Sequence, residues 1–124
     1  KKYIFNSNGE TQETTKLLSK ILSDMSSSIS MIECGGTSPI NQKREQWTDG
    51  ANAFALSPSI AIGYDINTYT LHEIEKAGYN VITHSKYLNN TYSPNDNIFI
   101  TIPASELSRG RGGARCLTLP LLRK

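Results

Sequence analysis

The 124-residue sequence is poor in cysteine and histidine and contains no long apolar run. Its two cysteines, Cys34 and Cys116, are too few for a disulfide scaffold and allow at most one bridge. No apolar segment approaches the roughly 20 residues that cross a bilayer, and residues 1–5 hold too short an apolar stretch for a secretion signal. These absences predict a cytoplasmic protein without a membrane partner, in which both thiols are free.

Acidic residues are absent from the end of the chain. No aspartate or glutamate follows Glu106, whereas the same tail carries Arg109, Arg111, Arg115, Arg123 and Lys124. The formal net charge of the whole chain is only +2, so its positive charge is concentrated there. Such a tail attracts an anion, which is a carboxylate, a phosphate or a nucleic acid.

Apolar periodicity and turn residues predict alternating strands and helices. Strands are expected at residues 3–5, 29–34, 53–56, 60–64, 98–102 and 116–122, and another begins at Val81. Helices are expected at about 17–25, with Thr11 or Thr14 as the cap, and at 67–77, with Thr68 or Thr70 as the cap and Gly78 at the C-terminal end. Residues 37–50 and 84–97 are polar and predict loops. This order of elements is typical of an α/β fold.

Residues 105–116, SELSRGRGGARC, combine glycines, arginines and a cysteine. The glycines let the backbone approach a ligand closely, and the arginines present planar donors that bind a carboxylate in a bidentate manner. Neighbouring guanidinium groups also stabilise a thiolate, the nucleophilic form of a cysteine, at Cys116. This arrangement is typical of a site that processes an amino acid.

Two other interpretations of this segment stay open. A cysteine at the head of an apolar strand, here residues 116–122, is usually a small buried hydrophobic residue. Arg-Gly-Arg-Gly-Gly is also similar to the RGG segments that bind RNA backbones. Those segments repeat and stay disordered, whereas this one occurs once and runs into an apolar stretch. We therefore expect no nucleic-acid partner.

Three segments together resemble the arginine deiminase family of the guanidino-group-modifying superfamily. Residues 44–52, REQWTDGAN, resemble its REQW-x-DG-x-N motif. Residues 56–65, LSPSIAIGYD, resemble its L-x-P-G-V-V-x-G-Y-D hairpin, with Ser59 where glycine is common. Residues 105–116 are similar to its terminal motif. The resemblance covers most of the chain from Gly35 onward.

The resemblance implies that residues 1–124 are the C-terminal part of a catalytic domain, a five-bladed α/β propeller of ββαβ-type modules. It implies hydrolysis of L-arginine to L-citrulline and ammonia through a cysteine thiouronium intermediate, with no metal or organic cofactor. Cys116 occupies the position of the family's nucleophile, and Arg111 that of an arginine that binds the substrate carboxylate. The expected partners are L-arginine, the missing N-terminal part on the same or a separate chain, and a second copy of the chain, because an isolated blade exposes apolar faces.

The general acid/base that the resemblance implies is missing from the sequence. The family places a His-x-Asp pair in earlier modules, whereas His72 and His84 have no aspartate two positions on and are expected to face solvent. We therefore predict that the isolated chain hydrolyses no arginine. The alternative is a degenerate arginine-binding or assembly module that keeps the carboxylate-binding loop without catalysis.

Four further features receive structural interpretations. Trp47 is interpreted as a packing residue, Asp49 as a turn or capping residue, and Cys34 as part of the core. Residues 84–97 are interpreted as an insertion relative to the family's usual short connection.

Overall fold

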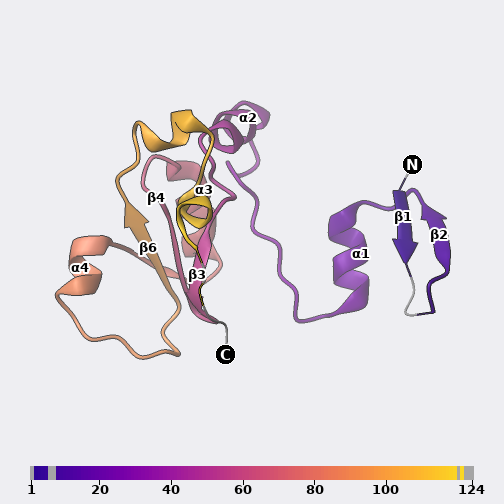
Figure 1. Ribbon diagram of the computed structural model, residues 1–124, viewed down its shortest axis with the longest axis horizontal. Helices are drawn as coiled ribbons and strands as arrows, with labels where there is room; N and C mark the ends of the chain where they lie inside the picture. The colour runs from indigo at the N-terminus through magenta and orange to yellow at the C-terminus, as the bar shows by residue number, and fades with distance from the viewer. Residues whose placement is uncertain (1, 6–7, 120, 122–124) are drawn as a thin grey trace. The chain divides into compact units, whose positions relative to one another are not determined.

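The computed structural model describes residues 2–5, 8–119 and 121. It divides into two compact units, Lys1–Met31 and Ile32–Lys124, which are described one at a time (Figure 1). The mixture of helices and strands confirms the predicted α/β class. No helix among the described residues has both the length and the apolar character needed to cross a membrane.

The first unit contains a two-stranded sheet and one helix. β1 (Lys2–Phe5) pairs antiparallel with β2 (Thr11–Thr14), and α1 (Leu18–Met25) follows. The first predicted strand and helix are confirmed. The expected cap at Thr11 or Thr14 is wrong, because both residues lie in β2 and the helix begins after Leu17 without a side-chain cap.

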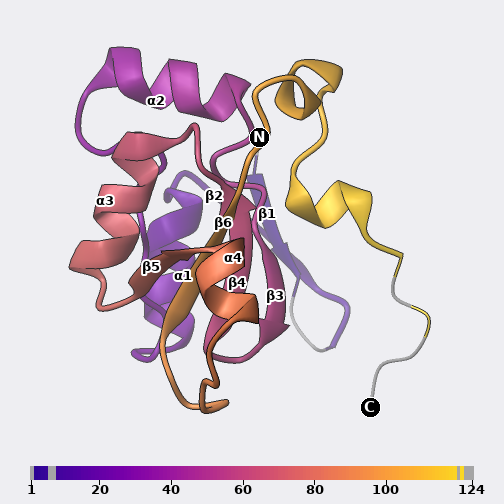
Figure 2. The same ribbon diagram turned by 90° about the vertical axis from the view of Figure 1, so that its left-hand side faces the viewer.

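The second unit is built on a four-stranded sheet with the order β3–β4–β6–β5. β3 pairs antiparallel with β4, whereas β4, β6 and β5 are parallel. The strands are β3 (Phe54–Ser57), β4 (Ile60–Tyr64), β5 (Asn80–Thr83) and β6 (Ile98–Ile102). The helices are α2 (Pro39–Trp47), α3 (Thr68–Lys76) and α4 (His84–Leu88). Two 3₁₀ turns follow, η1 (Leu107–Gly110) and η2 (Ala114–Leu117), and η2 lies against β3 and β4 (Figure 2).

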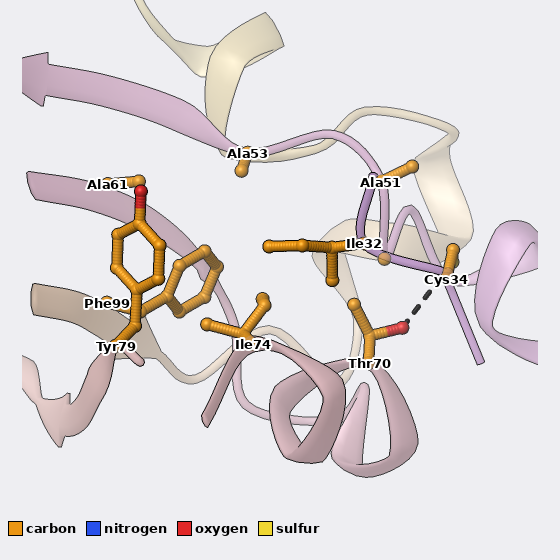
Figure 3. A pocket seen from close by; sticks show the side chains of 10 residues that line it. Ile32, Cys34, Ala51, Ala53, Ala61, Thr70, Ile74, Tyr79 and Phe99 are labelled. Carbon is orange, nitrogen blue, oxygen red and sulfur yellow. Dashed lines mark hydrogen bonds between the residues drawn. The ribbon is translucent and has the colours of Figure 1, made fainter. Parts of the chain in front are cut away.

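Side chains of the sheet alternate between two faces, and different helices cover them. On one face, a buried cluster forms from Ile60, Ile82, Ile98 and Ile100, and Tyr87 of α4 packs against it. α3 covers the other face, where Phe99 is buried and lines a pocket together with Ile74 of α3 (Figure 3). The ring of Phe99 occupies the space of a missing side chain, since a Cβ on Gly63 would lie 2.5 Å from it.

The apolar elements of the second unit agree with the predictions from sequence. The hairpin of β3 and β4, the helix α3 and the strands β5 and β6 are confirmed. Gly78 follows α3 with a φ of +92°, which is the left-handed conformation expected at a C-terminal cap.

Four predictions for residues 29–122 are wrong. Residues 29–34, expected as a strand, are irregular, and no strand of the described part of the chain pairs with them. The expected loop at 37–50 contains α2, which begins at Pro39, and the loop at 84–97 begins with α4. The expected buried strand at 116–122 is replaced by η2 and an exposed segment, within which residues 120 and 122 lie outside the described residues.

Glu45 of α2 holds the N-terminus of α3. Its carboxylate is completely buried and accepts hydrogen bonds from the backbone N–H groups of Tyr69 (2.9 Å) and Thr70 (2.7 Å), and from the Thr70 hydroxyl (2.7 Å). A cap from the side chain of Thr68 or Thr70 is therefore wrong. Because an anion is favoured at a helix N-terminus, this contact fixes α2, and the segment that follows it, against α3.

Candidate functional site

Cys116 lies in η2 with its side chain exposed to solvent. Its Sγ accepts a 3.1 Å hydrogen bond from Nδ2 of Asn52, and its backbone N–H donates to the carbonyl of Gly113 at 3.0 Å. The interpretation of Cys116 as a small buried hydrophobic residue is therefore wrong. An exposed thiol with a polar donor is accessible to a substrate.

Asn52 reaches Cys116 from the turn between α2 and β3. The turn reverses at Asp49, which has a φ of 60°, and the backbone N–H of Asn52 donates to the Asp49 carbonyl at 3.0 Å. The interpretation of Asp49 as a turn residue is confirmed. In the β3–β4 register Phe54 pairs with Ile62, so the residue two places before Phe54 lies at the same end of the sheet as Tyr64.

Gly113 leaves the space that the Asn52 side chain occupies. A Cβ on Gly113 would lie 2.3 Å from Cβ and 2.4 Å from Cγ of Asn52. The φ of Gly113 is −87°, which any residue adopts, so the requirement for glycine is steric. The interaction between Asn52 and the Cys116 loop gives this glycine a packing role.

Arg111 rests on the ring of Trp47. Its guanidinium carbon lies 4.2 Å from the ring centroid, which is a close cation–π contact. Arg111 follows η1 with a φ of 63°, and both side chains are exposed. Because Trp47 is 63% exposed, its ring packs against this guanidinium and not into the core.

Tyr64 at the end of β4 anchors the same loop. Its side chain is buried, and its hydroxyl donates a 2.9 Å hydrogen bond to the carbonyl of Gly112. Burial raises the pKa of Tyr64, and the nearby negative charges of Asp49 and Cys116 raise it further. The phenol therefore stays a protonated donor at neutral pH and fixes the backbone between Arg111 and Cys116.

The two histidines lie on other elements, His72 on α3 and His84 at the start of α4. His72 and His84 are exposed, as predicted, and His72 lies 3.7 Å from the Glu75 carboxylate on the same helix. Among the described residues, no group of three or more His, Cys, Asp or Glu side chains has the arrangement of a metal site. Arg123 and Lys124 lie outside the described residues.

A separate apolar pocket lies between the sheet and α3 (Figure 3). It has a volume of about 260 Å³ and is lined by Ala61, Ile74 and Phe99 among others. Cys34 is half-buried in its wall, with its Sγ 3.5 Å from the hydroxyl oxygen of Thr70. This position agrees with the interpretation of Cys34 as a packing residue of the core. Cys116 does not line this pocket.

Comparison with known proteins identifies the family of the chain. The family model described as arginine deiminase matches residues 5–123. The chain belongs to the arginine deiminase family. An arginine deiminase of Mycoplasma capricolum subsp. capricolum is 40% identical over 115 residues, which are 92% of this chain and 24% of that protein. Arginine deiminases of Latilactobacillus sakei and Clostridium perfringens are 35% and 40% identical over 96 residues, 77% of this chain and 19% of each relative. The chain thus spans about a fifth to a quarter of the length of these relatives.

The three segments that resemble arginine deiminase motifs meet at one place in the structure. Residues 44–52 contribute Trp47 and Asn52, residues 56–65 contribute Tyr64, and residues 105–116 contribute Arg111 and Cys116. The sequence singled out Arg111 and Cys116. It gave no signal for the roles of Asn52 and Tyr64, although both lie inside the quoted motifs, because their contacts join residues 64 and 48 positions apart.

Proposed function

We propose that this chain is the C-terminal part of an arginine deiminase that hydrolyses L-arginine to L-citrulline and ammonia. The observation that carries the proposal is the meeting of three family motifs at one exposed thiol, that of Cys116. Membership of the arginine deiminase family supports the substrate class. The share of 19–24% of the relatives' length supports a partial enzyme.

In the proposed reaction, Cys116 is the nucleophile. A guanidinium carbon is a poor electrophile because resonance spreads its charge, so attack requires a thiolate. The thiolate adds to this carbon, the C–N bond breaks, and ammonia leaves with a proton from a general acid, which gives a thiouronium. Water then adds to the same carbon and loses a proton to a base. Expulsion of the thiolate releases citrulline, and the steps require no metal or organic cofactor.

Arg111 is proposed to bind the substrate carboxylate. The indole ring of Trp47 covers one face of its guanidinium, at 4.2 Å from the guanidinium carbon. Stacking uses the face of the guanidinium group, whereas bidentate binding of a carboxylate uses the N–H groups at its edge. The two contacts are therefore compatible, and the stacked ring limits the rotamers that Arg111 samples before substrate arrives.

The other components of the reaction are proposed to come from the missing N-terminal part. Among the described residues, the side chain of His72 contacts Glu75 and that of His84 contacts Ser85, and no hydrogen bond joins either histidine to Cys116. The order β3, β4, α3, β5 reads as one ββαβ module, which supports a place in a five-bladed propeller. Leu117 and Leu119 are 59% and 81% exposed, and we propose that neighbouring modules or a second copy cover them in a cytoplasmic enzyme.

The proposal is tested by measuring citrulline formation from two proteins. The first is the purified 124-residue chain, which we expect to form no citrulline. The second is a chimera in which this chain replaces the matching segment of the Mycoplasma capricolum relative, and we expect it to be active. Citrulline formed by the isolated chain, or an inactive chimera that folds, contradicts the proposal.

The isolated chain also distinguishes the alternative of a binding module without catalysis. The proposed enzyme holds arginine with groups from several modules, so calorimetric titration of the 124-residue chain with L-arginine should show no measurable heat of binding. Binding by the isolated chain, together with an inactive chimera, supports the binding module instead.

A further inference from the structure

Asn52 makes a contact that the proposed function does not yet use. Its Nδ2 donates to the Sγ of Cys116 at 3.1 Å, which is the side-chain hydrogen bond that the structure records for this thiol. The amide cannot take the thiol's proton, because a side-chain amide is a donor and an acceptor but not a base at neutral pH. Its effect on Cys116 is therefore electrostatic and geometric.

The position of the Asn52 amide is fixed from two sides. The backbone N–H of Asn52 bonds to the Asp49 carbonyl at 3.0 Å, and the Asn52 side chain is half-buried. On the other side, a Cβ on Gly113 would lie 2.4 Å from Cγ and 2.8 Å from Nδ2 of Asn52, so the amide keeps this position because residue 113 has no side chain. The donor is thus held at the sulfur before any substrate binds.

We propose that Asn52 is a positioning residue that stabilises the thiolate of Cys116 and fixes the direction of its attack. A hydrogen bond donated to an anion is stronger than one donated to the neutral form, so the amide favours the thiolate over the thiol. Gly113 belongs to the same device, because a side chain there displaces the amide. This inference rests on the proposed role of Cys116 as the nucleophile.

The experiment measures the exchange of Cys116 with a neutral disulfide, 4,4′-dithiodipyridine, as a function of pH in the 124-residue chain. Peptide mass spectrometry reads the modification of Cys116 and Cys34 separately. Cys34 is the internal control, because it is half-buried and reacts faster if a variant unfolds. The variants are Asn52→Ala and the nearly isosteric Asn52→Asp, with Asn95→Asp, in the exposed 84–97 segment, as the matched control.

Loss of the Asn52 hydrogen-bond donor changes the pH dependence of the exchange rate in a way that loosening of the loop does not. If the bond changes the thiol–thiolate equilibrium about tenfold, its loss slows exchange at neutral pH about threefold and speeds the high-pH plateau about threefold, because a more basic thiolate is more nucleophilic. Asn52→Asp should show the larger change, since a carboxylate repels the thiolate. Asn95→Asp should leave the profile unchanged. A loosened loop raises the rate at every pH.

Gly113→Ala provides a second route to the same result. It should reproduce the profile of Asn52→Ala, and the double variant should add nothing further, because both changes remove one contact. A profile unchanged in Asn52→Asp with Cys34 still protected overturns the inference, as does a rate raised at every pH. These measurements use no arginine, so they fail independently of the proposed function, which rests on turnover by the chimera.

Discussion

Arg111 and Trp47 form a stacked pair in which the guanidinium carbon lies 4.2 Å from the centroid of the indole ring. Trp47 ends α2 and Arg111 follows η1, so the pair joins two of the three family motifs. Both side chains are exposed, and neither has a buried environment to hold it. The stack therefore orders an arginine that is otherwise free to sample many rotamers.

Removal of the ring should weaken substrate binding in the chimera with little change in kcat. For Trp47→Ala we expect KM for L-arginine to rise about fivefold, the size of an exposed cation–π contact. Trp47→Phe keeps an aromatic face and should show a smaller rise.

Arg111→Lys, which loses the bidentate edge, should raise KM by roughly tenfold or more. Steady-state kinetics with a normal KM for Arg111→Lys would remove Arg111 from the binding site.

Glu45 should contribute to stability through the three donors that surround it. In Glu45→Gln one oxygen becomes an NH₂ group that faces backbone donors, so we expect a loss of about 2–3 kcal/mol in the free energy of unfolding. Urea unfolding of the chain measures this loss. Glu75→Gln is the matched control, because Glu75 is exposed and its pair with His72 is long, at 3.7 Å. Its effect should stay within about 0.5 kcal/mol, and equal losses in the two variants would contradict the capping role of Glu45.

Tyr64 should make the second unit sensitive to alkali. The pKa of Tyr64 is raised in the folded chain by burial and by the charges of Asp49 and Cys116, above the value of about 10 of an unfolded tyrosine. The neutral phenol thus contributes stability that is fully present below about pH 10 and is lost as the pH rises through the folded-state pKa.

Tyr64→Phe should lower stability at neutral pH, because the hydrogen bond to Gly112 is lost, but should flatten the decline above about pH 10. Chemical unfolding at a series of pH values checks the slope, and tyrosinate absorbance reports the ionisation directly. A decline as steep in Tyr64→Phe as in the parent chain would place the alkaline sensitivity elsewhere.

The apolar elements of the fold were predictable from the sequence because their side chains alternate or recur with a helical period. Ile60 lies in β4 and Ile98 and Ile100 lie in β6, where their inward side chains form one buried cluster, and Gly78 marks the end of α3. The polar helix α2 was missed for the opposite reason. The only buried residue of α2 is Glu45, so no periodic pattern of apolar residues predicts this helix. Its stability depends on a contact with α3, which is distant in sequence.

The sequence could single out Arg111 and Cys116, the two positions that we propose carry the chemistry, because their residue types and spacing resemble a family motif. Their surroundings were not. The apolar letters after Cys116 favoured a buried strand, whereas Leu117 and Leu119 are exposed in the described chain. The contact of Asn52 with Cys116 could be found only in the folded structure, since an asparagine two residues after Gly50 is locally typical of a turn.

In the proposed reaction, the sulfur of Cys116 attacks the guanidine carbon of arginine. The decisive experiment measures citrulline formation by the chimera carrying Cys116→Ala, with Cys34→Ala as the matched control for the chain's other thiol. We expect Cys116→Ala to lower turnover by at least about 10⁴-fold while the protein still folds, because removal of a covalent nucleophile removes the reaction path. Cys34→Ala should keep most of the activity. Turnover by Cys116→Ala at a rate near that of the parent chimera would show that Cys116 is not the nucleophile.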